Sequence, residues 1–130
     1  MKIEFVPFEL AKKLKKIGYP QIEKNTLAMY DEDGEWYSLA TTIGVEYCFV
    51  DFNEHDCVCP TIEQVLTWIR EVHNIHIATG VTPRSSWRFV IMFCDERGLE
   101  EPTVTENNFH SFEDAVIEGI EYVIKNLIKV

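Results

Sequence analysis

The chain has 130 residues, of which 46% are apolar and 26% charged, and its net charge is −10. This composition describes a soluble globular protein with one core, and it excludes a disordered tail and a collagen-like chain. No apolar run approaches the ~20 residues that a membrane-spanning helix needs, and the first residues include acids and lysines where a secretory signal is apolar. We therefore expect a single globular domain over residues 1–130, located in the cytoplasm.

The first half of the sequence predicts a short strand, a helix, a hairpin and an inner strand. The strand covers residues 2–6 and precedes Pro7, a favoured first residue of a helix, which a glycine and a proline then end. Apolar runs flank Asp33 and Gly34, and this pattern predicts a β-hairpin because glycine accepts the positive φ of the turn. Residues 45–52 are apolar at both parities, as is typical of an inner strand.

The second half adds a helix, a second hairpin and a closing helix. The expected elements are, in chain order, a loop over 53–60, a helix from a capping box at Thr61 and Gln64 to about His73, a hairpin of residues 75–81 and 86–94, a loop over 95–102, a weak strand over 103–107, and a helix over 112–129 that begins after Ser111. Strands that arrive mainly as hairpins, with helices between them, indicate the α+β class. We expect an antiparallel or mixed sheet covered on one face by about three helices.

The closing helix is apolar around more than half of its circumference, which is more than one sheet face covers. It is therefore expected either at the centre of the core or at the edge of a subunit interface. A homodimer through this helix and an edge strand is one expectation that follows.

Three segments carry a resemblance to a known group of proteins. They read FVPFELAKKLKKIGY, PTIEQVLTWIREVHNI and SFEDAVIEGIEYVI, with a hairpin that has an acidic glycine turn between the first two. Their order resembles small uncharacterised proteins of phages and prophages of gut Bacteroidetes, which open with a similar F-V-P-x-E motif. The resemblance implies a phage or mobile-element context, and hence the cytoplasm of a bacterial host. It implies no catalytic residue, because the shared motifs are helix caps and core positions.

The charge balance argues against a nucleic-acid partner. A net charge of −10 repels phosphate, so binding would need a local basic stripe. The one candidate is a lysine cluster in the first helix, which we interpret as a solvated helix face because no aromatic residue interleaves with it. Its members are Lys12, Lys13, Lys15 and Lys16. The acidity also permits the opposite role, in which carboxylates imitate nucleic acid and inhibit a basic host enzyme.

The cysteines and one histidine form the sharpest local pattern. His55, Cys57 and Cys59 could supply three ligands to zinc, with Cys48 or Cys94 as the fourth. The spacing argues against this site, because structural zinc sites draw on C-x₂₋₄-C pairs that wrap around the metal. We therefore expect free thiols in a reducing compartment and no cofactor. A zinc-dependent or thiol-based enzyme at these residues remains an alternative.

Other catalytic signals are weak. His73 and His76 have metal-ligand spacing, but Asn74 between them is a good left-handed helix cap, so we expect the helix to end there. The chain contains no G-x-S-x-G sequence and no glycine-rich phosphate loop. These observations favour a protein without enzymatic activity.

One exposed cluster has the composition of a protein-binding site. Arg84, Trp87 and Arg88 lie on or beside the tip of the second hairpin, and Arg and Trp concentrate binding energy in small areas. The alternative is that Trp87 packs inward, since it has the strand parity of Phe89 and Ile91. We predict an accessory protein of phage or prophage that acts by binding a protein partner.

Overall fold

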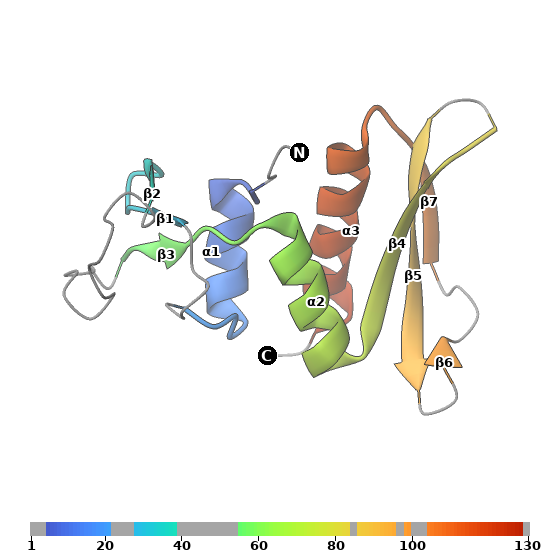
Figure 1. Ribbon diagram of the computed structural model, residues 1–130, viewed down its shortest axis with the longest axis horizontal. Helices are drawn as coiled ribbons and strands as arrows, with labels where there is room; N and C mark the ends of the chain where they lie inside the picture. The colour runs from blue at the N-terminus through green and yellow to red at the C-terminus, as the bar shows by residue number, and fades with distance from the viewer. Residues whose placement is uncertain are drawn as a thin grey trace. The chain divides into compact units, whose positions relative to one another are not determined.

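The computed structural model describes residues 5–21, 28–38, 55–83, 86–95, 98–99 and 104–128. The chain divides into two compact units, Met1–Thr61 and Ile62–Val130. Helices and antiparallel sheets occur in both units, which confirms the α+β class, and the strands are divided between two sheets (Figure 1). The single domain over residues 1–130 stays a prediction. No described helix is long and apolar enough to cross a membrane.

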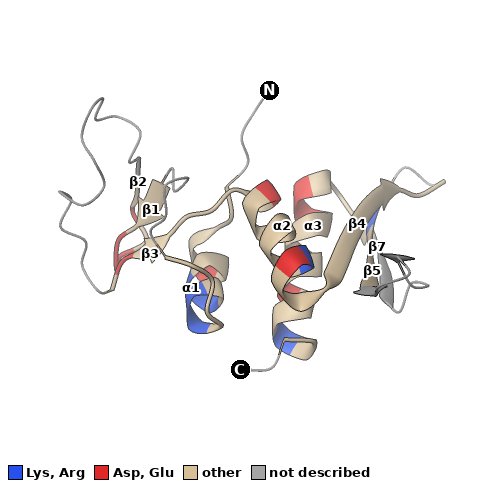
Figure 2. Ribbon diagram, turned by 60° about the horizontal axis from the view of Figure 1, so that its bottom comes forward, with Lys and Arg blue, Asp and Glu red and all other residues tan. Residues whose placement is uncertain are grey.

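The Met1–Thr61 unit begins with helix α1, Phe8–Lys16. Pro7 occupies the N-cap with extended backbone (φ −70°, ψ 161°), one position earlier than predicted. The buried side of α1 is narrow, as the sequence indicates, and consists of Leu10, Ala11 and Leu14. Lysines fill the last turn, where positive charge stabilises the exposed carbonyl groups (Figure 2).

The predicted first hairpin is confirmed as β1 (Ala28–Tyr30) and β2 (Trp36–Ser38). The Asp31 carboxylate accepts hydrogen bonds from the backbone N–H groups of Asp33 and Glu35, both at 2.9 Å. Gly34 adopts φ +86°, the left-handed conformation that glycine accepts without strain. The acidic turn is therefore an organised loop held by its own side chain.

A third strand of this sheet contradicts the predicted loop over residues 53–60. Strand β3 (Cys57–Val58) pairs antiparallel with β1, so the strand order is β2-β1-β3. Two residues are too few to show alternation in a sequence, and the pairing partner is distant in the chain. The strand predicted over residues 45–52 lies outside the described residues. Of residues 2–6, Phe5 forms an isolated bridge with Thr61.

The Ile62–Val130 unit follows the predicted order with one addition. Its elements are α2 (Ile62–His73), β4 (Ile75–Val81), β5 (Trp87–Asp95), β6 (Gly98–Leu99), β7 (Val104–Phe109) and α3 (Phe112–Asn126). The addition is β6, a two-residue strand inside the predicted loop over 95–102. The Ser111 hydroxyl accepts a hydrogen bond from the Asp114 backbone N–H at 3.1 Å, which confirms the predicted cap.

The core of this unit lies between its sheet and its helices. Strands β4, β5 and β7 are antiparallel neighbours, and α2 and α3 lie on the same side of them (Figure 1). Ile75, Ile77, Phe89 and Ile91 are buried on the helix side of the sheet. Helix α3 packs against β4, β5, β7 and α2 and is the central helix of this core. Its five buried residues are Ala115, Val116, Gly119, Ile120 and Val123.

Candidate functional site

The two thiols that the sequence singles out are buried in the Met1–Thr61 unit. Cys57 and Cys59 are free cysteines with 1% of their surface exposed. The Cys59 thiol points to the carbonyl oxygen of Val6 at 3.7 Å. Burial raises the pKa of both thiols. At neutral pH they are protonated, and a protonated thiol is a poor nucleophile and a poor metal ligand.

Two tyrosines satisfy polar groups around these thiols. The Tyr30 hydroxyl donates to the Val6 carbonyl oxygen at 2.7 Å, and the Tyr37 hydroxyl donates to the Asp56 carboxylate at 2.7 Å. Burial, followed by the hydrogen bonds to Cys59 and Asp56 respectively, raises the pKa of each phenol well above its ordinary value of 10.0. We name Tyr30, Tyr37, Cys57 and Cys59 the thiol–tyrosine cluster.

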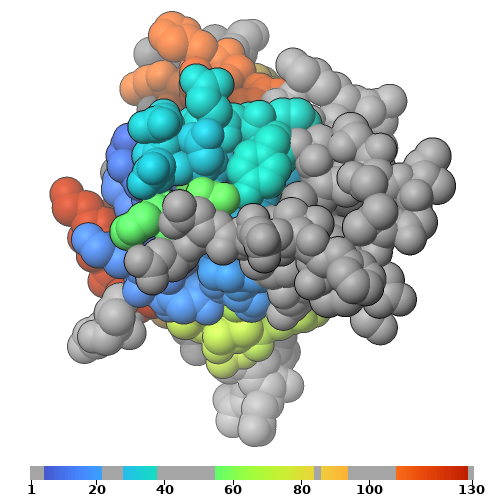
Figure 3. All heavy atoms as spheres, turned by 90° about the vertical axis from the view of Figure 1, so that its left-hand side faces the viewer, coloured from blue at the N-terminus to red at the C-terminus, as the bar shows by residue number. Residues whose placement is uncertain are grey.

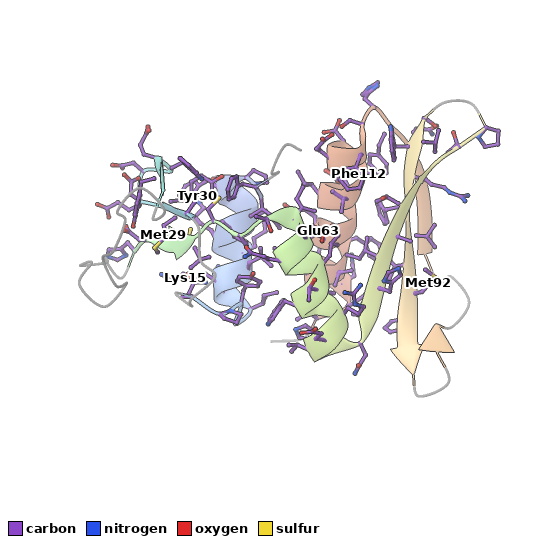
Figure 4. The ribbon with its side chains drawn as sticks, in the orientation of Figure 1. Lys15, Met29, Tyr30, Glu63, Met92 and Phe112 are labelled. Atoms are coloured by element: carbon purple, nitrogen blue, oxygen red, sulfur yellow. The ribbon has the colours of Figure 1, made fainter. Side chains whose placement is uncertain are left out.

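The backbone of β3 is held by side chains from elsewhere in the same unit. The Lys15 ammonium group donates a hydrogen bond to the carbonyl oxygen of Asp56 at 2.7 Å. The Gln21 side-chain oxygen accepts a hydrogen bond from the backbone N–H of Val58 at 2.9 Å. Figure 4 labels Lys15, Met29 and Tyr30 in this region, and Figure 3 shows residues 28–38 beside β3. The hydrogen bonds of this cluster lie within the protein, which is the pattern of a structural core.

The predicted zinc ligands are not equivalent in the structure. His55 is exposed, whereas Cys57 and Cys59 are buried. Within the described ranges, no group of three or more His, Cys, Asp or Glu side chains is arranged to hold a metal ion. Cys48 lies outside those ranges, as does the side chain of Cys94, so the four-ligand site stays a prediction.

The thiol–tyrosine cluster makes the stability of its unit sensitive to alkaline pH. All four groups have a raised pKa in the folded protein, so the unfolded chain loses their protons first as the pH rises. We expect stability to be constant between about pH 6 and 8 and to fall above about pH 9, where the unfolded thiols and then the phenols ionise. Hydrogen exchange of β1 and β3, followed by mass spectrometry at several pH values, measures this. Tyr37→Phe should lose less stability at alkaline pH, because it removes one phenol whose pKa is raised by folding. Equal protection from exchange at pH 8 and pH 10 in the wild type would contradict the prediction.

Two members of the predicted Arg and Trp cluster lie on opposite faces of the second sheet. Trp87 packs edge to face against Phe112 of α3, with ring centroids 5.8 Å apart, so its side chain lies on the helix side. Arg88 follows it in β5, lies on the opposite face and is exposed. Arg84 lies outside the described residues. The structure therefore does not bring Trp87 and Arg88 into one cluster.

The histidine pair is separated in the same way. Asn74 has φ +58°, which confirms the predicted left-handed end of α2. His73 packs edge to face against Trp68 with ring centroids 4.8 Å apart, and its buried Nε2 atom has no hydrogen-bond partner among the described residues. His76 alternates with the buried Ile75 and Ile77 along β4 and so lies on the other face of the sheet.

That other face holds residues that the sequence analysis did not single out, apart from Arg88 and His76. We name it the open face, because α2 and α3 pack on the opposite side. Register pairs His76 with Met92, Ala78 with Val90 and Gly80 with Arg88, and these six residues form the described part of the open face. The sequence predicts helices on one face of the sheet, but it does not identify which side chains lie on the uncovered face.

The open face combines apolar and basic side chains. Val90 and Met92 are half-buried in the central strand β5 (Met92 is labelled in Figure 4), and Arg88 beside them is exposed. A Cβ atom on Gly80 would lie 3.9 Å from Nε of Arg88, so the Arg88 side chain lies beside Gly80 of β4. The face therefore offers a small apolar area with an exposed cation at one end.

Comparison of the chain with protein-family models, curated proteins and solved structures gives no significant match.

Proposed function

We propose that this protein is a non-enzymatic accessory protein of a phage or prophage that binds a protein partner through the open face. The observation that carries the proposal is the apolar area of Val90 and Met92 next to the exposed guanidinium of Arg88. Methionine and arginine are enriched in protein interfaces, and arginine is frequent among the residues that dominate the binding energy. The cytoplasm of the bacterial host is the proposed location.

The charge of the open face indicates the chemistry of the partner. The chain has a net charge of −10, yet the described side chains of this face include a cation and a histidine and no carboxylate. Charge complementarity therefore favours a partner segment that places apolar side chains on Val90 and Met92 and a carboxylate near Arg88. Hydrogen bonds between Arg and carboxylate groups are strong and directional, which would fix the register of binding.

The buried thiols also support a binding role over a thiol-based enzyme. Their raised pKa leaves Cys57 and Cys59 protonated at neutral pH, and their 1% exposure keeps substrates away from both sulfur atoms. A catalytic cysteine is partly exposed and has a lowered pKa. The pKa and the exposure of Cys57 and Cys59 are therefore both typical of structural cysteines.

The test compares wild-type protein with Met92→Glu, Arg88→Glu and the control Glu118→Gln. Glu118 is exposed on α3, away from the open face. Each protein is immobilised, incubated with lysate of a gut Bacteroidetes strain, and a protein retained by the wild type is then purified for calorimetric titration. We expect both open-face variants to bind it at least ~10-fold more weakly, a loss of about 1.4 kcal/mol, and the control to bind normally. A partner that binds all four proteins equally would refute the open face as the site.

A further inference from the structure

Strand β4 lies at an edge of the second sheet and is unusually regular. Its seven residues pair with β5 without a break, from Ile75 opposite Phe93 to Val81 opposite Trp87. Among the described residues, no strand pairs with its other side. The opposite edge strand, β7, differs, because its register with β5 shifts between Trp87 and Phe89.

The hydrogen bonds of the hairpin show which backbone groups of β4 face outward. The Thr82 N–H donates to the Ser86 carbonyl oxygen at 2.7 Å, just beyond the last strand pair. In an antiparallel ladder, bonded and non-bonded pairs alternate. The even-numbered residues of β4 therefore bond to β5, and the odd-numbered ones direct their N–H and C=O groups away from it. The outward-facing residues are Ile75, Ile77, Thr79 and Val81.

β4 also lacks the devices that prevent edge strands from pairing. Natural edge strands are protected by charged side chains, prolines or bulges. The sequence of β4 is IHIATGV, without a Lys, Arg, Asp, Glu or Pro. In a chain of net charge −10, this strand can meet a second copy of itself without opposing carboxylates.

We infer that a second copy of this chain pairs antiparallel along the free edge of β4, with the two-fold axis at Ala78. This register places Ile75 opposite Val81 of the second copy, and Ile77 opposite its Thr79. All four outward-facing residues then find backbone partners, so no donor or acceptor along the edge is left unpaired. The two sheets become one continuous sheet.

The side chains fit this register as well. Ala78 lies on the axis and meets itself at a non-hydrogen-bonded position, where Cα atoms are only ~4.5 Å apart and a small side chain is favoured. His76 lies opposite Gly80 of the second copy, and because glycine has no side chain, the imidazole ring has room there. Val81, which is 57% exposed, gains an apolar neighbour in Ile75 of the second copy.

This inference goes beyond the proposed function. It concerns the edge of the sheet and a copy of the same chain, whereas the proposed function concerns the open face and a different protein. It is tested with purified protein alone, so its failure leaves the open-face titration unaffected.

The first test is a disulfide trap. Ala78→Cys places two thiols across the axis at ~4.5 Å between Cα atoms, within the range of 4.4–6.8 Å that a disulfide spans. The control is Val90→Cys, which lies on the same face opposite Ala78 in β5. Three strand spacings, roughly 14 Å, would separate the two copies of that residue, too far for a bond. Under mild oxidation we expect mass spectrometry to find a peptide joined from residue 78 to residue 78 and no equivalent link at residue 90.

The second test measures mass in solution. Light scattering of the wild type at micromolar concentration should give twice the chain mass of 15.2 kDa. Thr79→Pro removes one outward N–H that β5 does not use, so it should give 15.2 kDa with an unchanged circular dichroism spectrum. A wild type that stays at 15.2 kDa, or a Val90→Cys link as efficient as that of Ala78→Cys, would overturn the inference.

Discussion

Replacing Gly119 with alanine is expected to destabilise the Ile62–Val130 unit by about 1–3 kcal/mol, although alanine favours helices over glycine by about 1 kcal/mol. A Cβ atom at this position would lie 2.9 Å from Cγ2 of Ile77 and 3.2 Å from Cγ of Phe89. Neither neighbour can move easily, because Phe89 is fully buried and Cγ2 is fixed to the branched Cβ atom of Ile77. The new methyl group therefore separates α3 from the sheet.

Urea denaturation followed by tryptophan fluorescence measures this loss in a Trp36→Phe background, which leaves Trp68 and Trp87 as the two tryptophans. Both tryptophans belong to the affected unit. Glu118→Ala is the control, since it changes the neighbouring exposed residue of the same helix and should alter stability little. Gly119→Val should lower stability further. An alanine variant as stable as the wild type would show that α3 does not approach the sheet this closely.

The second large effect is expected at Gly34, in the turn between β1 and β2. Alanine there would hold φ at +86°, a conformation that disfavours residues with a Cβ atom by roughly 1–2 kcal/mol. Its Cβ atom would also lie 2.8 Å from the ring of Phe8 in α1. The two effects act together, so we expect Gly34→Ala to destabilise the Met1–Thr61 unit by about 2–4 kcal/mol.

Hydrogen exchange resolved by peptide localises this effect. Gly34→Ala should lower the protection of α1 and β1 and leave α3 unchanged. Combining it with Phe8→Leu separates the two causes, because the smaller side chain relieves the contact but not the backbone strain. If the double variant is no more stable than the Gly34→Ala single variant after correction for Phe8→Leu alone, the contact with Phe8 does not contribute.

Local chemistry predicted most elements of the described fold. The hairpin turn at Gly34, the end of α2 at Asn74 and the cap of α3 at Ser111 each depend on one residue with a specific backbone preference. The hairpin of β4 and β5 was predicted to within a residue or so. These features need no knowledge of distant contacts, which is why the sequence alone could predict them.

Features that depend on distant partners could not be predicted. β3 exists because residues 57–58 pair with β1, nearly thirty positions earlier, and β6 because Gly98 and Leu99 pair with the end of β5. The division of strands between two sheets has the same origin. In short strands, long-range pairing decides the structure, and neither propensity nor periodicity records it.

The candidate site shows the same limit. Sequence parity correctly indicated that Trp87 could pack inward, and the contact with Phe112 shows why Trp87 and Arg88 lie on different faces. The sequence could not show which face of the sheet the helices leave uncovered, because that depends on how the amphipathic helices fold back onto it. The open face became visible only with the arrangement of α2 and α3.

The burial of Cys57 and Cys59 also controls how fast the protein is damaged by oxidation. Peroxides and electrophiles attack thiolates that they can reach, and these two sulfur atoms offer neither charge nor access while the unit is folded. Damage at these atoms must then wait for a transient opening of the backbone. The rate at which these two sulfur atoms oxidise in air would therefore report how often the backbone around them opens.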